Sequence, residues 1–122
     1  MTAPPAGSED FYCAEALTGR TPVVKIRETA EVLAFRHTRP SFETHIVVIP
    51  KRHIPSFLDL SIRPAELLAL LDVVREVAAQ VVSETGACRI QTNLGRYQDT
   101  QHLHWHVFSG DRVSLSRLFA AR

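Results

Sequence analysis

The chain places three histidines at every second position of one short stretch, His102-Leu103-His104-Trp105-His106-Val107-Phe108. Successive side chains of a β-strand point to opposite faces, so a strand here carries all three imidazoles on one face. A helix would scatter the rings around its axis, but the aromatic and β-branched residues of the stretch favour a strand. The stretch therefore predicts a row of imidazoles on a sheet whose opposite face, formed by Leu103, Trp105 and Val107, belongs to the core.

The composition is that of one globular domain. The 122 residues are 45% apolar, which is enough to build a core. The formal net charge of +1 offers no electrostatic argument for nucleic acid or a membrane as a partner. No apolar run approaches the roughly 20 residues of a membrane span. We therefore expect neither nucleic acid nor a membrane among the partners.

The N-terminal segment and the cysteines bear on where the protein works. Residues 1–10 are rich in Pro, Ala, Gly and Ser and lack the basic start and apolar segment of a secretory signal. We expect them to be a disordered lead, followed by a single domain over residues 11–122. Cys13 and Cys88 are too few for a disulfide framework, so we expect reduced thiols and a cytoplasmic protein.

The order of expected elements indicates an α+β fold around a mostly antiparallel sheet. Alternating or β-branched runs predict strands at residues 23–28, 32–37, 44–49, 87–92 and 102–108. Polar loops are expected at 38–43 and 93–100, and a short apolar segment at 115–119.

One long helix is expected from Arg63 or Pro64 to Glu84, because its apolar residues recur every three or four positions. Pro64 suits the first turn, Gly86 suits the C-terminal cap, and Ser61 is an alternative N-cap. A second, short helix is expected at residues 11–17.

The row of histidines has three possible uses. Its members can be surface residues, although three on one face, backed by an apolar face, make this the weakest alternative. They can bind zinc, since neutral imidazoles with one open position suit a catalytic ion. They can catalyse in two steps, since one imidazole can attack phosphorus while its neighbours fix its tautomer and supply protons.

A zinc site built from all three histidines is geometrically awkward. Same-face neighbours on a strand lie about 7 Å apart, so three rings reach one ion only with difficulty. A set of two of these histidines together with His45 or Cys13 is a more reasonable group of zinc ligands. A zinc-dependent hydrolase using such ligands stays an alternative to imidazole catalysis.

The stretch from His102 to Phe108 matches His-φ-His-φ-His-φ-φ, where φ is apolar, the pattern that defines the histidine triad (HIT) family. The resemblance extends upstream to Val32-Leu33-Ala34-Phe35, Pro40 and Thr44-His45-Ile46-Val47-Val48-Ile49-Pro50-Lys51-Arg52-His53-Ile54. It includes Thr92-Asn93-Leu94-Gly95 and Gln98, and the tail Val107-Phe108-Ser109-Gly110-Asp111-Arg112 is most similar to the Hint branch of nucleoside phosphoramidases. It covers about residues 11–112.

The resemblance implies distinct roles within the triad. The middle histidine of the family is the nucleophile, so His104 would attack the α-phosphorus of a nucleotide and carry the nucleotidyl group. His102 would help to hold the His104 tautomer through its backbone, and His106 would contact phosphate oxygens. His45 matches the family's fourth histidine, buried behind the triad; a core histidine with satisfied hydrogen bonds is the alternative.

Other residues complete the implied site. Asn93 matches an asparagine near the ribose and the 5′ oxygen, with turn formation as the alternative. Gln98 falls in the phosphate-side loop. His53 is interpreted as a capping or surface residue, and Cys88 as a core residue.

Three positions depart from the family pattern. His37 stands where the family has an Asp that holds both ribose hydroxyls, and an imidazole cannot accept two hydrogen bonds from a diol. Asp99 stands where the Hint branch has a serine near the leaving group, and its carboxylate would repel polyphosphate. Cys13 keeps only the second cysteine of the Cys-x-x-Cys through which some bacterial members hold zinc, with Asp10 in place of the first. We therefore expect His37 and Asp99 to contact the substrate and set its identity, and we expect no zinc.

The resemblance implies a HIT-fold homodimer whose two sheets join, with the long helix near the interface and no obligatory metal or other cofactor. The implied activity is hydrolysis or transfer of a nucleoside 5′-monophosphoryl group from a phosphoramidate or a small ester or anhydride, through a His104 intermediate. A nucleotide-binding module with weak catalysis stays an alternative, because the ribose carboxylate is missing.

Overall fold

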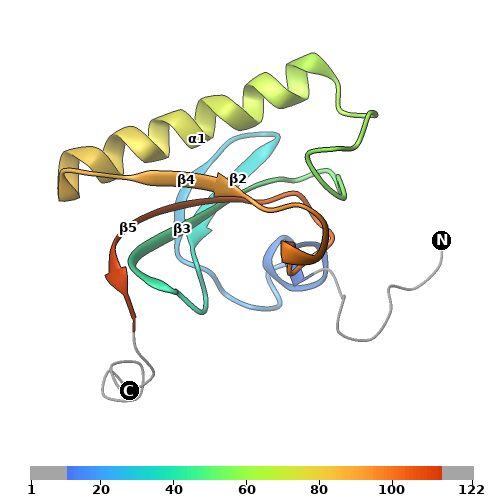
Figure 1. Ribbon diagram of the computed structural model, residues 1–122. Helices are drawn as coiled ribbons and strands as arrows, with labels where there is room; N and C mark the ends of the chain where they lie inside the picture. The colour runs from blue at the N-terminus through green and yellow to red at the C-terminus, as the bar shows by residue number, and fades with distance from the viewer. Residues whose placement is uncertain (1–10, 114–122) are drawn as a thin grey trace.

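The computed structural model describes residues 11–113 as one antiparallel sheet with a long helix across one face (Figure 1). The strands are β1 (Lys25–Glu28), β2 (Val32–Arg36), β3 (Phe42–Pro50), β4 (Arg89–Thr92) and β5 (Trp105–Arg112). They lie in the order β1-β2-β3-β5-β4, and every neighbouring pair is antiparallel. The expected α+β fold is confirmed. The expected lead at 1–10 and the apolar segment at 115–119 lie outside the described residues.

The long helix α1 (Pro64–Thr85) begins and ends close to the predicted residues. Pro64 occupies its first turn, and the backbone N–H of Arg63 donates to the Glu66 carboxylate at 3.1 Å, so Arg63 rather than Ser61 is the N-cap. Gly86 ends the helix with a φ of 89°, a left-handed conformation that glycine adopts without strain. Within residues 11–113, no helix is long and apolar enough to cross a membrane.

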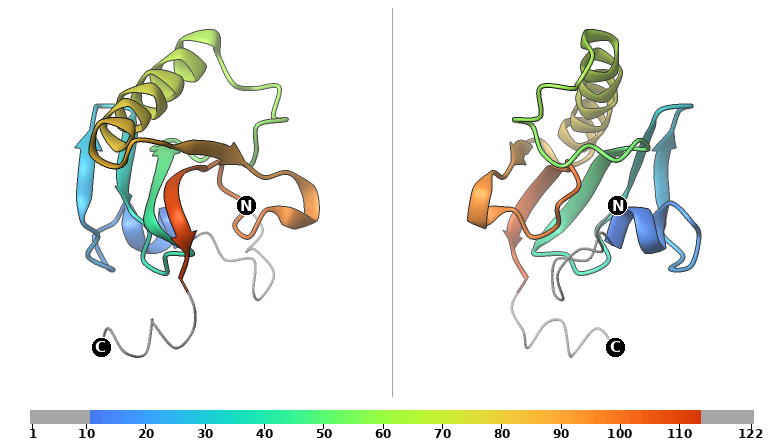
Figure 2. Two further views of the ribbon diagram at one scale, coloured as in Figure 1. Left: turned by 60° about the vertical axis from the view of Figure 1, so that its left-hand side comes forward. Right: turned by 90° about the vertical axis from the view of Figure 1, so that its right-hand side faces the viewer.

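Two short helical segments lie near the ends of the strands. The π-helical turn η1 (Tyr12–Ala16) covers the face of the sheet opposite to α1 (Figure 2). The 3-10 turn η2 (Gly95–Tyr97) lies in the connection between β4 and β5. The short helix predicted at residues 11–17 is therefore present, although it is π-helical.

The sheet separates two apolar layers, because alternate residues of each strand point to opposite faces. The layer under α1 contains Val32, Ala34, Ile46, Val48, Leu103 and Val107 together with Leu70, Val73, Val74, Val77 and Val81 of the helix. The layer under η1 contains Leu33, Phe35, Val47 and Ile49 together with Tyr12 and Ala16. The second layer is small, and the histidines occupy the rest of that face.

The strand predicted at 102–108 starts later than predicted. β5 begins at Trp105, which pairs with Val48, and β3 ends two residues beyond, at Pro50. The N–H of Leu103 donates instead to the carbonyl of Ile54 at 2.6 Å, outside the ladder. The side chains before β5 still alternate between the two faces: the apolar residues of the stretch pack in the layer under α1. The predicted start of the strand was therefore wrong, whereas the prediction that the histidines share the other face is confirmed.

Candidate active site

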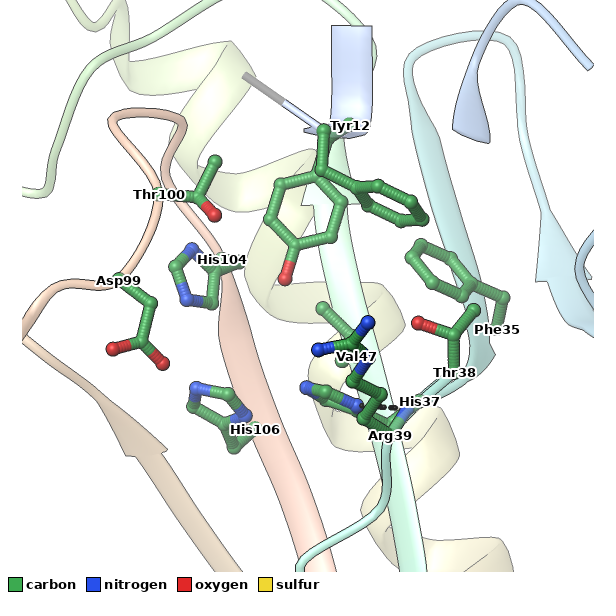
Figure 3. Close-up of a pocket in the computed structure, with 11 residues that line it drawn as sticks. Tyr12, Phe35, His37, Thr38, Arg39, Val47, Asp99, Thr100, His104 and His106 are labelled. Carbon is green, nitrogen blue, oxygen red and sulfur yellow. Dashed lines mark hydrogen bonds between the residues drawn. The ribbon is translucent and has the colours of Figure 1, made fainter. Parts of the chain in front are cut away.

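A cavity of about 380 Å³ opens on the histidine face, between η1, the β2–β3 loop and the β4–β5 loop (Figure 3). One end is apolar, and the other is polar. The apolar end is formed by Phe11, Tyr12, Phe35 and Val47, and the polar lining by His37, Thr38, Arg39, Asp99, Thr100, His104 and His106. The cavity therefore has room for a flat apolar group next to a charged one.

His104 is almost fully buried and lines this cavity. Its Nδ1 lies 2.7 Å from the carbonyl oxygen of His102. A carbonyl can only accept, so Nδ1 carries the ring proton and Nε2 carries the lone pair. The Tyr12 ring packs against the imidazole, with ring centroids 5.1 Å apart, which further restricts the orientation of the ring. The geometry makes Nε2 a base or a nucleophile.

A chain of hydrogen bonds behind the cavity fixes the tautomer of His106. The N–H of Ser41 donates to Nδ1 of His45 at 3.0 Å, so Nε2 of a neutral His45 carries the proton. That Nε2 donates in turn to Nδ1 of His106 at 2.9 Å. Nε2 of a neutral His106 therefore carries a proton. His106 lines the cavity, and this arrangement gives the cavity a hydrogen-bond donor.

His37 follows the same pattern at the end of the β2–β3 loop. The N–H of Arg39 donates to its Nδ1 at 2.9 Å, so Nε2 of a neutral His37 is also a donor. The His37 ring packs against His45 in a tilted arrangement, with centroids 4.4 Å apart, and its centroid lies 6.0 Å from that of His106. The three rings form one cluster, His37–His45–His106, on one side of His104.

These three histidines are held in the neutral form. Burial lowers the pKa of His45 to about 3, with the neighbouring His37 and His106 adding to the shift. Burial lowers the pKa of His106 to about 4, and the charges of His104 and His37 add to this effect while Asp99 opposes it. Burial and His104 also lower the pKa of His37, again against Asp99. The cluster is therefore uncharged near neutral pH.

A second cluster, Cys13–His53–His102, lies on the other side of His104. Nε2 of His102 lies 2.8 Å from the carbonyl oxygen of Pro50, so Nε2 carries the proton and Nδ1 the lone pair. Cys13 Sγ lies 3.2 Å from this Nδ1 and 3.6 Å from Nδ1 of His53. His53, interpreted from the sequence as a capping or surface residue, is exposed but belongs to this cluster.

The two clusters differ in their fitness for a metal ion, although the donor atoms of each lie within 4.8 Å of one another. Ligands of a tetrahedral zinc ion lie about 3.5 Å apart, close to the Cys13 distances. His102 also donates its one N–H, at Nε2, to a backbone carbonyl, as metal-bound histidines do. In the other cluster, Nε2 of both His37 and His45 is protonated and has no lone pair for an ion.

Some bacterial members of the family hold a zinc ion near this position, and the Cys13 cluster offers three of the four ligands that such an ion needs. Asp10, at the position of the missing cysteine, lies outside the described residues. The triad does not converge on one ion, since His102 lies in one cluster, His106 in the other and His104 in neither. The expectation that the chain needs no metal stays a prediction.

The structure gives different surroundings to the three predicted polar residues. Asp99 lines the main cavity and a second one of about 370 Å³, which also contains His37, Arg39 and His106. Asn93 lines the second cavity only, and its Oδ1 accepts from the Gln91 amide at 3.0 Å.

Gln98 lines neither of these cavities. Its buried amide donates to the carbonyls of Pro55 at 2.6 Å and Thr100 at 2.9 Å, which braces the loop that carries Asp99. Its predicted contact with substrate stays a prediction, whereas its contacts within the chain are with backbone.

Sequence reasoning missed several residues of the site. Tyr12 and Phe11 form the apolar end of the cavity from a segment interpreted only as a short helix. Arg39 lines both cavities, and Ser41 fixes the His45 tautomer. The loop position of Arg39, two residues after His37, was a usable signal for its place at the cavity. The Ser41 contact uses a backbone N–H and leaves no trace in residue type.

Comparison with known proteins identifies the family of the chain. The family model described as HIT domain matches residues 18–113. An uncharacterized 13.2 kDa HIT-like protein from the hisE 3′ region of Azospirillum brasilense is 39% identical over 104 residues, which cover 82% of this chain and 85% of that protein. The adenosine 5′-monophosphoramidase hnt1 of Schizosaccharomyces pombe is 33% identical over 99 residues, which cover 80% of this chain and 71% of that protein.

Comparison with solved structures identifies the same family. A solved structure described as Hit Like Protein superposes with a TM-score of 0.68 at 31% identity, and the match covers 79% of this chain and 94% of that one. The five-stranded antiparallel sheet with one long helix is thus the fold that this protein shares with its relatives. With the matched domain and the triad in place, the chain belongs to the HIT family.

Proposed function

We propose that the protein hydrolyses or transfers a nucleoside 5′-monophosphoryl group through a covalent His104 intermediate. The observation that carries the proposal is the hydrogen bond of 2.7 Å from Nδ1 of His104 to the His102 carbonyl. This bond puts the lone pair on Nε2, because the backbone carbonyl two residues earlier in the chain holds the proton on Nδ1. A ring with a fixed tautomer at a cavity wall has the arrangement that a nucleophile needs.

The proposed reaction has two displacements at one phosphorus atom. Nε2 of His104 bonds to the α-phosphorus while the bond to the leaving group breaks, and the leaving nitrogen takes up a proton from solvent so that it departs as an amine. Nε2–H of His106 donates to a phosphoryl oxygen and stabilises the charge that develops on it. Water then attacks the phosphorus and loses a proton to solvent, the bond to Nε2 breaks, and the nucleoside 5′-monophosphate leaves; another acceptor in place of water gives transfer.

The two ends of the cavity support a nucleotide as the substrate. The aromatic end, with Phe11, Tyr12 and Phe35, suits the flat face of a base. Asp99 lies on the wall beside His104 and His106 (Figure 3), where it would accept a hydrogen bond from a leaving amine. This placement favours phosphoramidates over polyphosphates, and the Schizosaccharomyces pombe relative is by its name an adenosine 5′-monophosphoramidase.

The test uses adenosine 5′-phosphoramidate with the wild-type chain and with His104→Ala. We expect release of adenosine 5′-monophosphate by the wild type only, and a rapidly quenched reaction whose intact mass shows one adenylyl group on His104. Equal rates for both proteins would disprove the mechanism. Circular dichroism of the variant checks that its fold is intact.

A nucleotide-binding module with weak catalysis is the second candidate, and the presence of His37 at the family's ribose carboxylate position favours it. Calorimetry with adenosine 5′-monophosphate separates the two. Binding without turnover of any phosphoramidate or small ester supports the module, and turnover that depends on His104 excludes it.

We further propose a homodimer in which the two sheets join along β4. β4 is an edge strand, and 52% of the Ile90 side chain on it is exposed. Val82, in the last turn of α1, is also an exposed apolar residue, and exposed apolar side chains on an edge strand and on a helix are features of contact surfaces. Sedimentation equilibrium of the wild type and of Ile90→Lys tests this proposal: we expect a dimer and a monomer, respectively.

A further inference from the structure

The β2–β3 loop forms one wall of the site and presents hydrogen-bond donors to it. Because the Arg39 N–H occupies Nδ1 of His37, the neutral His37 ring has only an N–H at Nε2 to offer. The Arg39 side chain lines both cavities, and its guanidinium points into the main cavity in Figure 3. No carboxylate of residues 11–113 forms an ion pair with it. This wall therefore offers donors and a positive charge.

The opposite wall has the reverse character. Asp99 projects from the β4–β5 loop on the side of the cavity away from His37 and Arg39 (Figure 3). A substrate that fits both walls has an anionic group toward Arg39 and a neutral or positive group toward Asp99. An amine leaving group satisfies Asp99, so the anionic group belongs to the part of the substrate that stays bound.

A sugar with two free hydroxyls is a poor partner for the donor wall. A carboxylate at position 37 accepts the protons of both hydroxyls, whereas His37 and Arg39 leave those protons without an acceptor. A phosphate ester has acceptor oxygens only, and arginine binds such oxygens in a charge-assisted, bidentate way. The second cavity, about 370 Å³ and sharing His37 and Arg39 with the first, has room for such a group. Its lining also contains Arg112 and Asp99, so two cations and one carboxylate border this cavity.

We propose that His37 and Arg39 form a second phosphate subsite, so that the preferred substrate is a nucleotide with a phosphate on its 2′ or 3′ oxygen as well as the reacting 5′-phosphoryl group. The inference rests on the proposed function and names the substrate class of that site. His37 donates from Nε2, Arg39 supplies the charge, and the 5′-phosphorus lies at His104.

The experiment compares adenosine 5′-phosphoramidate with its 2′-phosphate, 3′-phosphate and 2′-deoxy derivatives. We expect at least ~10-fold higher kcat/KM for one of the phosphorylated compounds, the gain from one charge-assisted contact. Arg39→Ala removes this advantage, and His37→Asp reverses it in favour of the free diol. Arg36→Ala is the matched control, since Arg36 is an exposed arginine at the end of β2 that lines neither cavity.

Several results would overturn the subsite. One is a free diol that reacts as fast as the phosphorylated sugars. Another is an advantage that survives in Arg39→Ala. A third is a phosphoramidate with a carboxylate on its leaving amine that gains the same Arg39-dependent advantage, which would assign the anion to the leaving group.

Binding separates this inference from the proposed function. Calorimetry compares adenosine 3′,5′-bisphosphate and adenosine 2′,5′-bisphosphate with adenosine 5′-monophosphate in the wild type and in Arg39→Ala. Tighter, Arg39-dependent binding of a bisphosphate without turnover of any compound would support the subsite and refute the reaction. Turnover through His104 with no difference in binding would refute the subsite alone.

Discussion

Two clusters of three side chains lie on either side of His104, and they differ in the position of their protons. Cys13–His53–His102 and His37–His45–His106 both hold donor atoms within 4.8 Å of one another. In the first, a backbone carbonyl accepts a hydrogen bond from Nε2 of His102, so the lone pair on Nδ1 faces Cys13. In the second, backbone N–H groups donate to Nδ1 of His37 and His45, so the proton of each neutral ring lies on Nε2.

The difference teaches that the chemistry of an imidazole depends on the hydrogen-bond partner at its other ring nitrogen, which is a backbone group for most of these histidines and His45 for His106. A carbonyl behind the ring makes a ligand or a nucleophile, and His104 is of this kind. An N–H behind the ring makes a hydrogen-bond donor. Both kinds occur along one short stretch, since His102 and His104 belong to the first and His106 to the second.

The largest effect is expected at the residue that belongs to neither cluster. His104→Ala removes the nucleophile, and we expect kcat for a nucleoside phosphoramidate to fall about 10⁴-fold. Cobalt binding at Cys13–His53–His102, described below, should not change, because His104 is not a member of that cluster. Residual turnover within tenfold of the wild type would place the nucleophile elsewhere.

The donor character of the second cluster depends on one backbone N–H. Ser41→Pro removes the donor to Nδ1 of His45, so His45 and His106 lose their fixed tautomers, and we expect kcat to fall about 10²-fold. Ser41→Ala keeps the N–H and is the control, with kcat near the wild-type value. If both variants behave alike, the hydroxyl or the loop conformation matters and the tautomer does not.

Metal titration separates the clusters directly. Cobalt(II) added to the purified protein should bind at the Cys13 cluster and give a thiolate-to-cobalt charge-transfer absorption. Cys13→Ser should remove that absorption and weaken binding about 10- to 100-fold. His37→Ala should leave both unchanged, because His37 has no lone pair to offer. Loss of cobalt binding in His37→Ala would contradict this prediction and would place the metal in the His37–His45–His106 cluster.

The smallest effect is a loss of stability in mild acid that belongs to the second cluster. The folded-state pKa values of His45 and His106, about 3 and about 4, lie below the ordinary value of 6.5, so the unfolded chain binds more protons between these limits. Stability is therefore complete above pH 6.5 and falls as the pH decreases toward 4. We expect roughly 2 kcal/mol for each group between pH 7 and pH 5.

Urea denaturation at several pH values measures this loss. His45→Gln has one titrating group fewer, so its stability should depend less on pH than that of the wild type. His53→Gln, in the other cluster and exposed, should keep the wild-type dependence. A free energy of unfolding that does not change with pH in the wild type would mean that these histidines can be protonated without destabilising the fold, which would contradict the prediction.

Much of this arrangement could be predicted from residue type and spacing. The period-two histidines identified the shared face, the periodic apolar residues identified α1, and Pro64 and Gly86 identified its ends. These features depend on local geometry, which a short stretch of sequence determines.

The remainder depends on contacts between distant segments. The start of β5 at Trp105 is set by where β3 ends and where β4 pairs, about fifty and thirteen residues earlier in the chain. The place of His53 beside Cys13 depends on how η1 docks on the sheet. The tautomers depend on backbone groups, such as the Ser41 N–H, that every residue except proline has.

The late start of β5 has a consequence for how far this site can be altered. Within an antiparallel ladder each carbonyl is already committed to a neighbouring strand, but the His102 carbonyl lies just before the ladder begins and is available to the His104 ring. Moving the triad two residues deeper into a strand would keep its spacing and its face, but the carbonyl that now binds Nδ1 of His104 would be used by the ladder. The fixed tautomer of His104 therefore depends on the place where the strand begins as well as on the order of the histidines.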